Sequence, residues 1–213
     1  MSDRRTWSAA CSTISLVAAV LLSALAAYAG EAQWSPLWDA LAKRSDAKVI
    51  DGVNDKGEAT RRIDLSPGVS FSLERHGDRI TSMGIDTSGL GAVQCSWEIY
   101  VGVRSYTEAC FPGEDRSFEA DLDDGIDRMN DFIVENSLVP VTKSQLQDAV
   151  GQRNREAKEA VRGRSDDDRR KQCAANAISP MASAFRSTSH DSRVSMVNKL
   201  LSVKRPPVKN PCL

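Results

Sequence analysis

The chain has 213 residues, of which 41% are hydrophobic and 27% are charged. This length suits one domain, with at most an appendage, and it is sufficient to bury a core. Histidine occurs only at His76 and His190, which limits any histidine-dependent mechanism to these two positions. His76 lies in a predicted tight turn and His190 lies before a predicted helix cap, so both are ordinary solvent-facing positions.

The formal net charge of −1 combines two unlike segments. Residues 30–150 carry 12 basic and 22 acidic side chains, whereas residues 151–213 carry 14 basic and 6 acidic ones. This division indicates either an intramolecular match of charges or two surfaces for oppositely charged partners. We therefore divide the chain into an acidic α+β body at residues 30–150 and a basic helical tail at residues 151–213, which packs on the body or is appended to it.

Residues 1–29 have the three parts of a secretory signal peptide. Arg4 and Arg5 form a basic head, residues 8–29 are uncharged, and Ala27-Tyr28-Ala29 is a small-residue cleavage site. The alternative is an uncleaved anchor, because residues 8–29 are long enough to cross a hydrocarbon core of ~30 Å as a helix. Under either interpretation we expect the body to be exported to the periplasm or the extracellular space, with a membrane involved only through export or an anchor.

Four cysteines remain after removal of the signal peptide, which also removes Cys11. An even number of cysteines in an oxidising compartment predicts two disulfides, for which three pairings are formally possible. We favour Cys95 with Cys110 and Cys173 with Cys212, because each pair then lies within one region of the chain. The cysteines lack CxxC or nearby histidine spacing, so we expect no metal site. We also expect no cofactor.

The order of sequence patterns predicts an α+β fold, with an antiparallel β-meander of four to five strands followed by a helical C-terminal half, crosslinked by disulfides. A short helix is expected to start at Ser35 and Pro36. Short β-rich runs then extend from about residue 48 to residue 105, separated by turn residues at 54–57, 66–68, 76–78 and 89–91.

The clearest predicted strand covers residues 93–103, where apolar and polar residues alternate without a break. This alternation points Cys95 into the core. The opposite face then carries Glu98, Tyr100 and Arg104, which we regard as a candidate binding surface.

Beyond residue 113 the apolar residues recur with a helical period. Asp121, Asp123 and Asp124 are expected near the start of the first helix, where the helix dipole favours acidic side chains, and Pro140 is expected to stop it. A second helix should begin at the capping-box pattern of Thr142 with Gln145 and run to about residue 161, with its later half exposed. Two further helix starts are expected at Ser165 with Asp168 and at Asp191, before a proline-rich, extended end at residues 204–213.

The strongest candidate for chemistry is the acidic run at residues 114–131. Its members Asp121, Asp123 and Asp127 complete the candidate binding surface. The register of a calcium-binding loop fails, because a loop starting at Glu119 has Asp124 where glycine is required. The GxSxG, GxxxxGK[ST] and GxGxxG motifs are absent, and the basic residues of the tail lack interleaved aromatics, so we expect neither nucleotide chemistry nor nucleic-acid binding.

The sequence therefore predicts an exported, non-enzymatic protein that binds another macromolecule, as an envelope accessory protein, an inhibitor or an immunity factor would. A basic protein partner would be drawn to the acidic body. One alternative is a small secreted hydrolase that uses the acidic run. Another is a surface-associated structural protein that binds anionic lipid or polymer through its basic tail.

Overall fold

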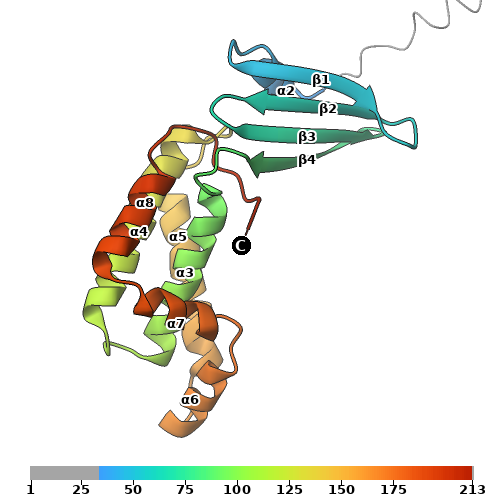
Figure 1. Cartoon of the computed structure of the whole chain (residues 1–213). Helices are drawn as coiled ribbons and strands as arrows, with labels where there is room; N and C mark the ends of the chain where they lie inside the picture. Colours follow the sequence, from blue (N-terminus) through green and yellow to red (C-terminus); the bar gives the residue numbers. More distant parts are fainter. Residues whose placement is uncertain (1–33, 213) are drawn as a thin grey trace, which may run out of the picture. The chain divides into compact units, whose positions relative to one another are not determined.

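The computed structural model describes residues 34–212. The predicted signal peptide at residues 1–29 and Cys11 lie outside the described residues. Within them, a four-stranded antiparallel meander precedes a series of helices (Figure 1), which confirms the predicted α+β fold class. Contacts divide the chain after residue 39, and the larger unit, residues 40–213, contains every helix and strand except the first residues of α2.

The elements, in chain order, are α2 (Pro36–Ala42), β1 (Ala47–Val53), β2 (Ala59–Leu65), β3 (Val69–His76), β4 (Arg79–Asp86), α3 (Val93–Cys110), α4 (Arg116–Asn136), α5 (Lys143–Val161), α6 (Asp166–Ala174), α7 (Ser179–Ser187) and α8 (His190–Leu200). Helix α2 begins at the predicted position, where the backbone N–H of Asp39 donates to the carbonyl of Ser35.

The strands lie in the order β1-β2-β3-β4, each joined to the next by one of the predicted turns. The register places Ile63 opposite Phe71 and Leu65 opposite Val69, so these four side chains share one face of the sheet. All four are buried. The alternation of apolar and polar residues in β3 thus gives the sheet one apolar face.

The prediction of a strand at residues 93–103 is wrong, because this segment forms the N-terminal part of helix α3. Most residues of α3 are buried, including Val93, Tyr100, Val101 and Val103. A helix buried around most of its circumference shows no amphipathic stripe, and an apolar run of this kind cannot be told from a strand by periodicity alone.

The helices enclose a core of their own, built around α3 and α4. Its fully buried side chains include Val103 on α3 and Leu122 and Met129 on α4. Helix α8 packs along α4 (Figure 1) and contributes Val197 and Leu200.

Helix α5 packs against α3, yet none of its residues is fully buried. The capping box of Thr142 with Gln145 is present at its N-terminus, as predicted. Ser165 likewise caps α6 by accepting a hydrogen bond from the backbone N–H of Asp168.

Two helix starts differ from the sequence prediction. Asp115 caps α4, so Asp121, Asp123 and Asp124 lie beyond its first turn and cannot be explained by the helix dipole, which acts within that turn. Ser189, rather than Asp191, caps α8.

The two disulfides join Cys95 to Cys212 and Cys110 to Cys173, with Cα–Cα distances of 5.3 and 5.9 Å. All four predicted cysteines are therefore crosslinked, but the favoured pairing is wrong. Cys95 and Cys110 lie near opposite ends of α3, and a rise of 1.5 Å per residue separates them by roughly 22 Å. A disulfide requires Cα atoms within about 7 Å.

Arg205 joins the sheet to the helices from within the protein. Its side chain is 0% exposed and donates from Nε to Oδ2 of Asp86, at the end of β4, over 2.6 Å. Its Nη atoms donate to the carbonyls of Leu200, Val203 and Gly91 at 2.7–3.0 Å. One guanidinium thereby holds together β4, the connection to α3, the end of α8 and the C-terminal segment.

The C-terminal segment continues onto the sheet beyond Arg205. Asn210 forms a parallel bridge with Ile85, and the buried Val208 lies against Gly84. A Cβ atom on Gly84 would lie only 2.6 Å from Cγ1 of Val208, so β4 requires glycine at this point for the segment to approach.

The disulfide pairing can be checked by peptide mapping under acidic, non-reducing conditions. Trypsin cleaves after Arg104, which separates Cys95 from Cys110. We expect one crosslinked pair of peptides that contains Cys95 and Cys212 and another that contains Cys110 and Cys173. Recovery of a peptide pair linking Cys95 to Cys110 would contradict the observed fold of α3.

Replacing Arg205 with methionine should lower the free energy of unfolding by about 3–5 kcal/mol, because it leaves the buried carboxylate of Asp86 without its charged partner. Urea denaturation measures the change. The matched control is Lys209→Met in the same segment, which removes an exposed ion pair with Glu98 and should cost less than about 1 kcal/mol. If both variants lost the same free energy of unfolding, the buried ion pair would stabilise the protein no more than the exposed one.

Candidate functional site

The six residues predicted to form a binding surface do not lie together. Asp123 and Asp127 on α4 line one groove, and Arg104 on α3 pairs with Asp123 beside it. Glu98, Tyr100 and Asp121 are engaged elsewhere.

The groove runs between α4 and α5 and has a volume of about 200 Å³. Both helices contribute apolar and polar side chains to it. These are Asp123, Ile126, Asp127 and Asn130 from α4, with Gln147 and Val150 from α5.

The exposed side of α4 carries a row of carboxylates along this groove. Asp123, Asp127 and Asp131 recur at every fourth position, which places them on one face of the helix. Lys143 at the start of α5 donates to Asp131 over 2.7 Å, and this hydrogen bond raises the pKa of the lysine. Asp127 faces solvent and forms no hydrogen bond or ion pair with any residue in the range 34–212, although its charge also contributes to raising the pKa of Lys143.

Arg104 lies beside the groove and pairs with Asp123, one of its lining residues. Its guanidinium contacts Glu108, Glu119 and Asp123, at 3.2, 3.8 and 2.8 Å, and its side chain is 15% exposed. Burial lowers the pKa of Arg104, but the three carboxylates outweigh this effect and raise the pKa overall. Arg104 thus offsets part of the negative charge beside the groove and leaves Asp127 as the carboxylate without a direct cationic partner.

Asn130 lies at the base of the groove and is 1% exposed. Its Oδ1 accepts a hydrogen bond of 2.7 Å from Nε1 of Trp97, which fixes the asparagine side chain between α3 and α4. Asn130 is not among the residues predicted from the sequence. The sequence signal for this buried position is a single asparagine among the apolar residues of a predicted helix.

Tyr100 belongs to the core rather than to a surface. The side chain is 4% exposed and packs edge-to-face on Phe185, with ring centroids 5.2 Å apart. A Cβ atom on Gly125 would lie 2.6 Å from its ring, so α4 can pass the tyrosine only because glycine stands there. Burial raises the pKa of Tyr100.

Asp121 anchors helix α8. The guanidinium of Arg193, which is nearly buried, donates to Oδ2 of Asp121 and to the carbonyls of Phe185 and Thr188. Oδ1 of Asp121 lies 2.7 Å from Nδ1 of His190. Burial raises the pKa of Asp121, but the hydrogen bonds from Arg193 and His190 lower it further, so the net shift is downward.

Glu98 pairs with Lys209 over 2.7 Å and so holds the C-terminal segment against α3. This is one of five Lys or Arg ion pairs that join the described parts of residues 30–150 and residues 151–213. The others are Arg205–Asp86, Lys158–Glu108, Arg186–Asp115 and Arg193–Asp121, and a hydrogen bond joins His190 to Asp121 as well.

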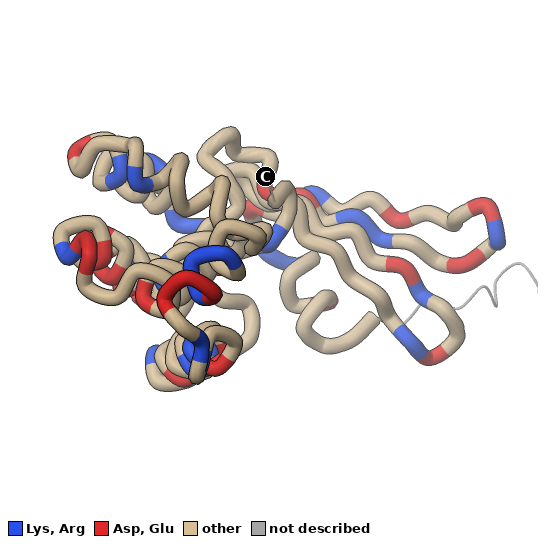
Figure 2. Tube along the Cα trace, turned by 90° about the horizontal axis from the view of Figure 1, so that it is seen from below, with Lys and Arg blue, Asp and Glu red and all other residues tan. Residues whose placement is uncertain are grey.

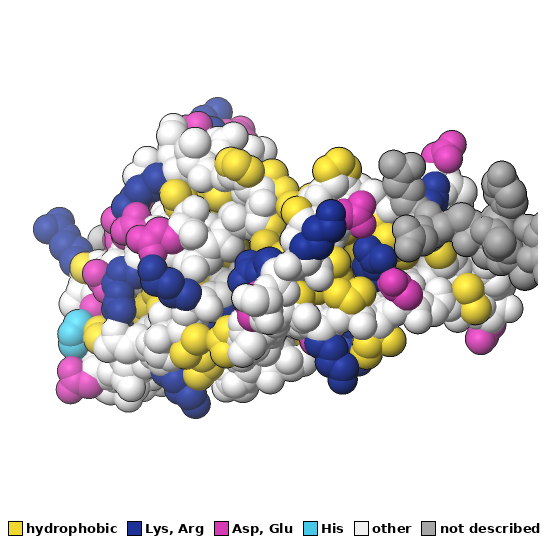
Figure 3. Space-filling view, turned by 90° about the horizontal axis from the view of Figure 1, so that it is seen from above, with side chains coloured by type: hydrophobic (Ala, Val, Ile, Leu, Met, Phe, Trp, Pro, Cys, Tyr) yellow, Lys and Arg dark blue, Asp and Glu magenta, His cyan; other side chains and the backbone are white. Residues whose placement is uncertain are grey.

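Acidic and basic positions accordingly lie near one another along the helices (Figure 2). On the face in Figure 3, acidic and basic side chains are interspersed, with apolar patches between them. Part of the negative charge of residues 30–150 is thus paired with positive charge of residues 151–213 in the same chain.

The described residues offer little for metal or histidine chemistry. Between residues 34 and 212, no group of three or more His, Cys, Asp and Glu side chains is placed to hold a metal ion. His76 lies between Glu58 and Glu74, at 2.9 and 3.5 Å, in the exposed hairpin of β3 and β4. Over the same stretch of chain, no helix is long and apolar enough to span a membrane.

Comparisons of the chain with models of protein families, with curated protein sequences and with solved structures find no match. The candidate site is therefore defined by its own geometry: a groove between α4 and α5 that is lined by the apolar Ile126 and Val150 and by the buried Asn130, with Asp127 as a carboxylate that has no ion pair among residues 34–212.

Replacing Asp121 with asparagine should destabilise the protein by about 1–3 kcal/mol at neutral pH, because Arg193 loses its charged acceptor. The pKa of Asp121 is lowered in the folded state, so its contribution is complete above pH ~4 and is lost as the pH falls through the lowered pKa. Denaturation curves of the two proteins should therefore converge in strongly acidic solution. Asp124→Asn, at an exposed neighbour, is the control and should change stability by less than about 0.5 kcal/mol.

Proposed function

We propose that the chain is an exported, non-enzymatic protein that binds a basic segment of another protein in the groove between α4 and α5. Its role would be that of an envelope accessory protein, an inhibitor or an immunity factor. The two disulfides indicate an oxidising compartment, which supports export to the periplasm or the extracellular space.

The observation that carries the proposal is the state of Asp127. Most carboxylates near it already have a cationic partner in the chain, as Asp123 has Arg104 and Asp131 has Lys143. Asp127 lies between these two pairs without a hydrogen bond or ion pair of its own among residues 34–212, beside the apolar Ile126 and Val150, and only the more distant charge of Lys143 acts on it. A lysine or arginine of a partner could pair with Asp127 while its aliphatic stem covers the apolar base.

The binding role is favoured over the two alternatives by the same contacts. The hydrolase alternative loses two members of the acidic run, because Asp115 caps α4 and Asp121 binds Arg193. The polymer-binding alternative loses part of its positive charge, because five of the 14 basic side chains of the tail are paired with body carboxylates: Lys158, Arg186, Arg193, Arg205 and Lys209.

The proposal can be tested with a fluorescently labelled, lysine-rich peptide whose binding is followed by fluorescence anisotropy. We expect Asp123→Asn/Asp127→Asn to weaken binding about tenfold at low salt, because two carboxylates are lost, and the difference to shrink at high salt. A thermal melt of each variant verifies that it is folded.

The matched control is Asp55→Asn/Asp78→Asn, which removes the same charge from exposed turns of the sheet. It should leave the affinity nearly unchanged. If both double variants weaken binding equally, the attraction depends on net charge and the groove is not the site. If the wild type does not bind the peptide, the cationic-partner proposal is wrong.

A further inference from the structure

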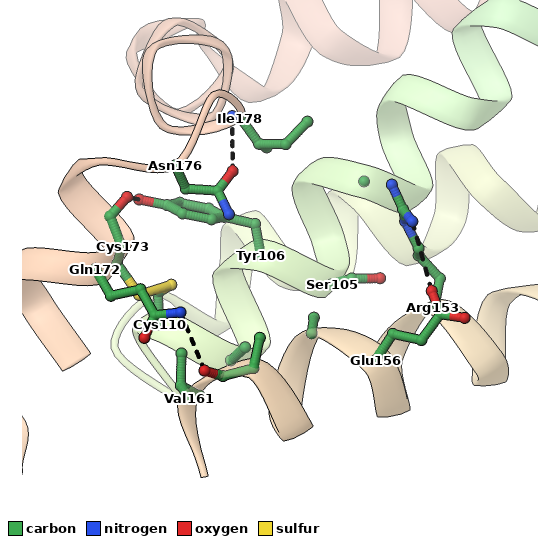
Figure 4. Close-up of a pocket in the computed structure, with 14 residues that line it drawn as sticks. Ser105, Tyr106, Cys110, Arg153, Glu156, Val161, Gln172, Cys173, Asn176 and Ile178 are labelled. Carbon is green, nitrogen blue, oxygen red and sulfur yellow. Dashed lines mark hydrogen bonds and ion pairs between the residues drawn. A yellow bond between two sulfur atoms is a disulfide. The ribbon is translucent and has the colours of Figure 1, made fainter. Parts of the chain in front are cut away.

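Helix α5 borders a second hollow besides the groove, a cavity of about 250 Å³ between α3, α5 and α6 (Figure 4). Side chains on its wall make their hydrogen bonds within the chain: Ser105 donates to Asn154, and the hydroxyl of Tyr106 donates to the carbonyl of Cys173. Gln172 has an unpartnered Oε1, but this atom is fully enclosed and cannot meet a ligand in the cavity. The groove differs, because a deeply buried side chain of its wall has an unpartnered atom that remains accessible.

The side-chain amide of Asn130 has a fixed orientation. The indole N–H of Trp97 is a donor only, so the amide atom that it contacts over 2.7 Å must be the oxygen. Trp97 belongs to α3 and Asn130 to α4, and the hydrogen bond therefore orients the amide from a neighbouring helix. The amide nitrogen takes the other position and carries two N–H groups.

This nitrogen, Nδ2, has no acceptor among residues 34–212. It is not sealed in the interior, because the enclosed unpartnered side-chain atoms of the described residues belong to Tyr100, Thr107, Arg169 and Gln172. The exposed 1% of Asn130 thus includes Nδ2, and the hollow that Asn130 lines is the groove. Buried polar groups are nearly always hydrogen-bonded, so Nδ2 needs an acceptor that enters through the groove.

The surroundings of Nδ2 select the charge of this acceptor. Ile126 and Asp127 precede Asn130 by four and three positions, so the three side chains share one face of α4. An anionic acceptor would be repelled by Asp127 and by the row of carboxylates to which it belongs, whereas a neutral carbonyl would not. The groove thus offers a carboxylate for a cation and an amide donor for a neutral oxygen, with Ile126 and Val150 beside them.

We propose that the groove binds an extended segment of its basic partner, in which a main-chain carbonyl accepts from Nδ2 of Asn130 while a lysine or arginine pairs with Asp127. A helical segment uses its main-chain carbonyls internally except in its last turn, whereas an extended segment leaves them free. The assignment rests on the proposed function and adds Asn130 as the residue that recognises the main chain. In the free protein a water molecule can occupy the position of the carbonyl, which displaces it on binding.

The test uses the full, oxidised chain and two small probes, 6-amino-N,N-dimethylhexanamide and 6,7-dimethyloctylamine. Both have an ammonium group on the same alkyl stem, but the first ends in a carbonyl that only accepts, and the second ends in a branched alkyl group of nearly the same shape. NMR titration follows the backbone amides of α4 and α5 and the side-chain N–H resonances of Asn130. We expect saturable shifts along the groove with both probes, and a downfield shift of the Asn130 side-chain protons with the carbonyl probe alone.

Asn130→Asp replaces the donor by an oxygen and keeps the acceptor for Trp97. Its added charge acts on both ammonium probes alike, so the ratio of their affinities isolates the lost hydrogen bond. This ratio should shift against the carbonyl probe by about tenfold. The matched control is Asn154→Asp, which makes the same exchange on α5 outside the groove, keeps the acceptor for Ser105 and should leave the ratio unchanged. If Asn130→Asp does not fold, the Asn130 resonances of the wild type decide the question.

The conformation of the segment is tested with two lysine-rich peptides, one unstructured and one held as a helix by a hydrocarbon crosslink. The unstructured peptide should move the Asn130 side-chain resonances and bind more tightly. Equal or tighter binding of the helical peptide would overturn the extended conformation.

The outcomes separate this assignment from the proposed function on which it rests. If both probes bind, but the Asn130 resonances stay in place and Asn130→Asp leaves the affinity ratio unchanged, the role of Asn130 is wrong and the cation site stands. If neither probe gives saturable shifts at millimolar concentration, the proposed function fails at this groove and the assignment fails with it.

Discussion

The structure depends most on the buried ion pair between Arg205 and Asp86. Placing two charges in the interior is unfavourable unless every donor and acceptor is satisfied. Here the guanidinium finds one carboxylate oxygen and three backbone carbonyls, while the other oxygen of Asp86 accepts from the backbone N–H and the hydroxyl of Ser88. The donors and acceptors come from distant parts of the chain, so the pair is favourable only in one arrangement of sheet, helices and C-terminal segment.

The other long-range contacts build on this arrangement. The position of the C-terminal segment brings Cys212 to Cys95, and the contact of Asp121 with Arg193 holds α8 along α4. Helix α5 is held less firmly: it has no fully buried residue, and its side chains meet α3 and α4 across two hollows. The candidate groove and the cavity therefore both border the helix that contributes least to the core. This agrees with the general rule that binding regions are drawn from the less stable parts of a protein.

Features that depend on neighbouring residues could be predicted from the sequence. The cap of Thr142 with Gln145, the cap at Ser165 and the turns of the meander involve side chains within a few positions of one another. The failures concern contacts between distant residues. The segment after Val93 alternates like a strand, although it forms a helix that is buried on most sides. The disulfide pairing was expected within each region of the chain, but helix α3 holds Cys95 and Cys110 near its opposite ends. The acidic run predicts Asp121 on a surface, and only the folded chain brings its partner Arg193 to it from 72 residues away; no sequence pattern indicates that the buried Asn130 lines a groove.

The observed crosslinks are nested, because the loop closed by Cys110 and Cys173 lies inside the one closed by Cys95 and Cys212. Any single cut of the backbone between residues 95 and 212 therefore leaves the two fragments covalently joined. The exposed connection between α5 and α6, with Arg162, Gly163 and Arg164, is an obvious point of attack for trypsin-like proteases. A molecule nicked there would remain one covalent unit, with the helices on either side of the cut still tethered through α3. In a compartment that contains proteases, such tolerance of a nick would extend the lifetime of the folded protein.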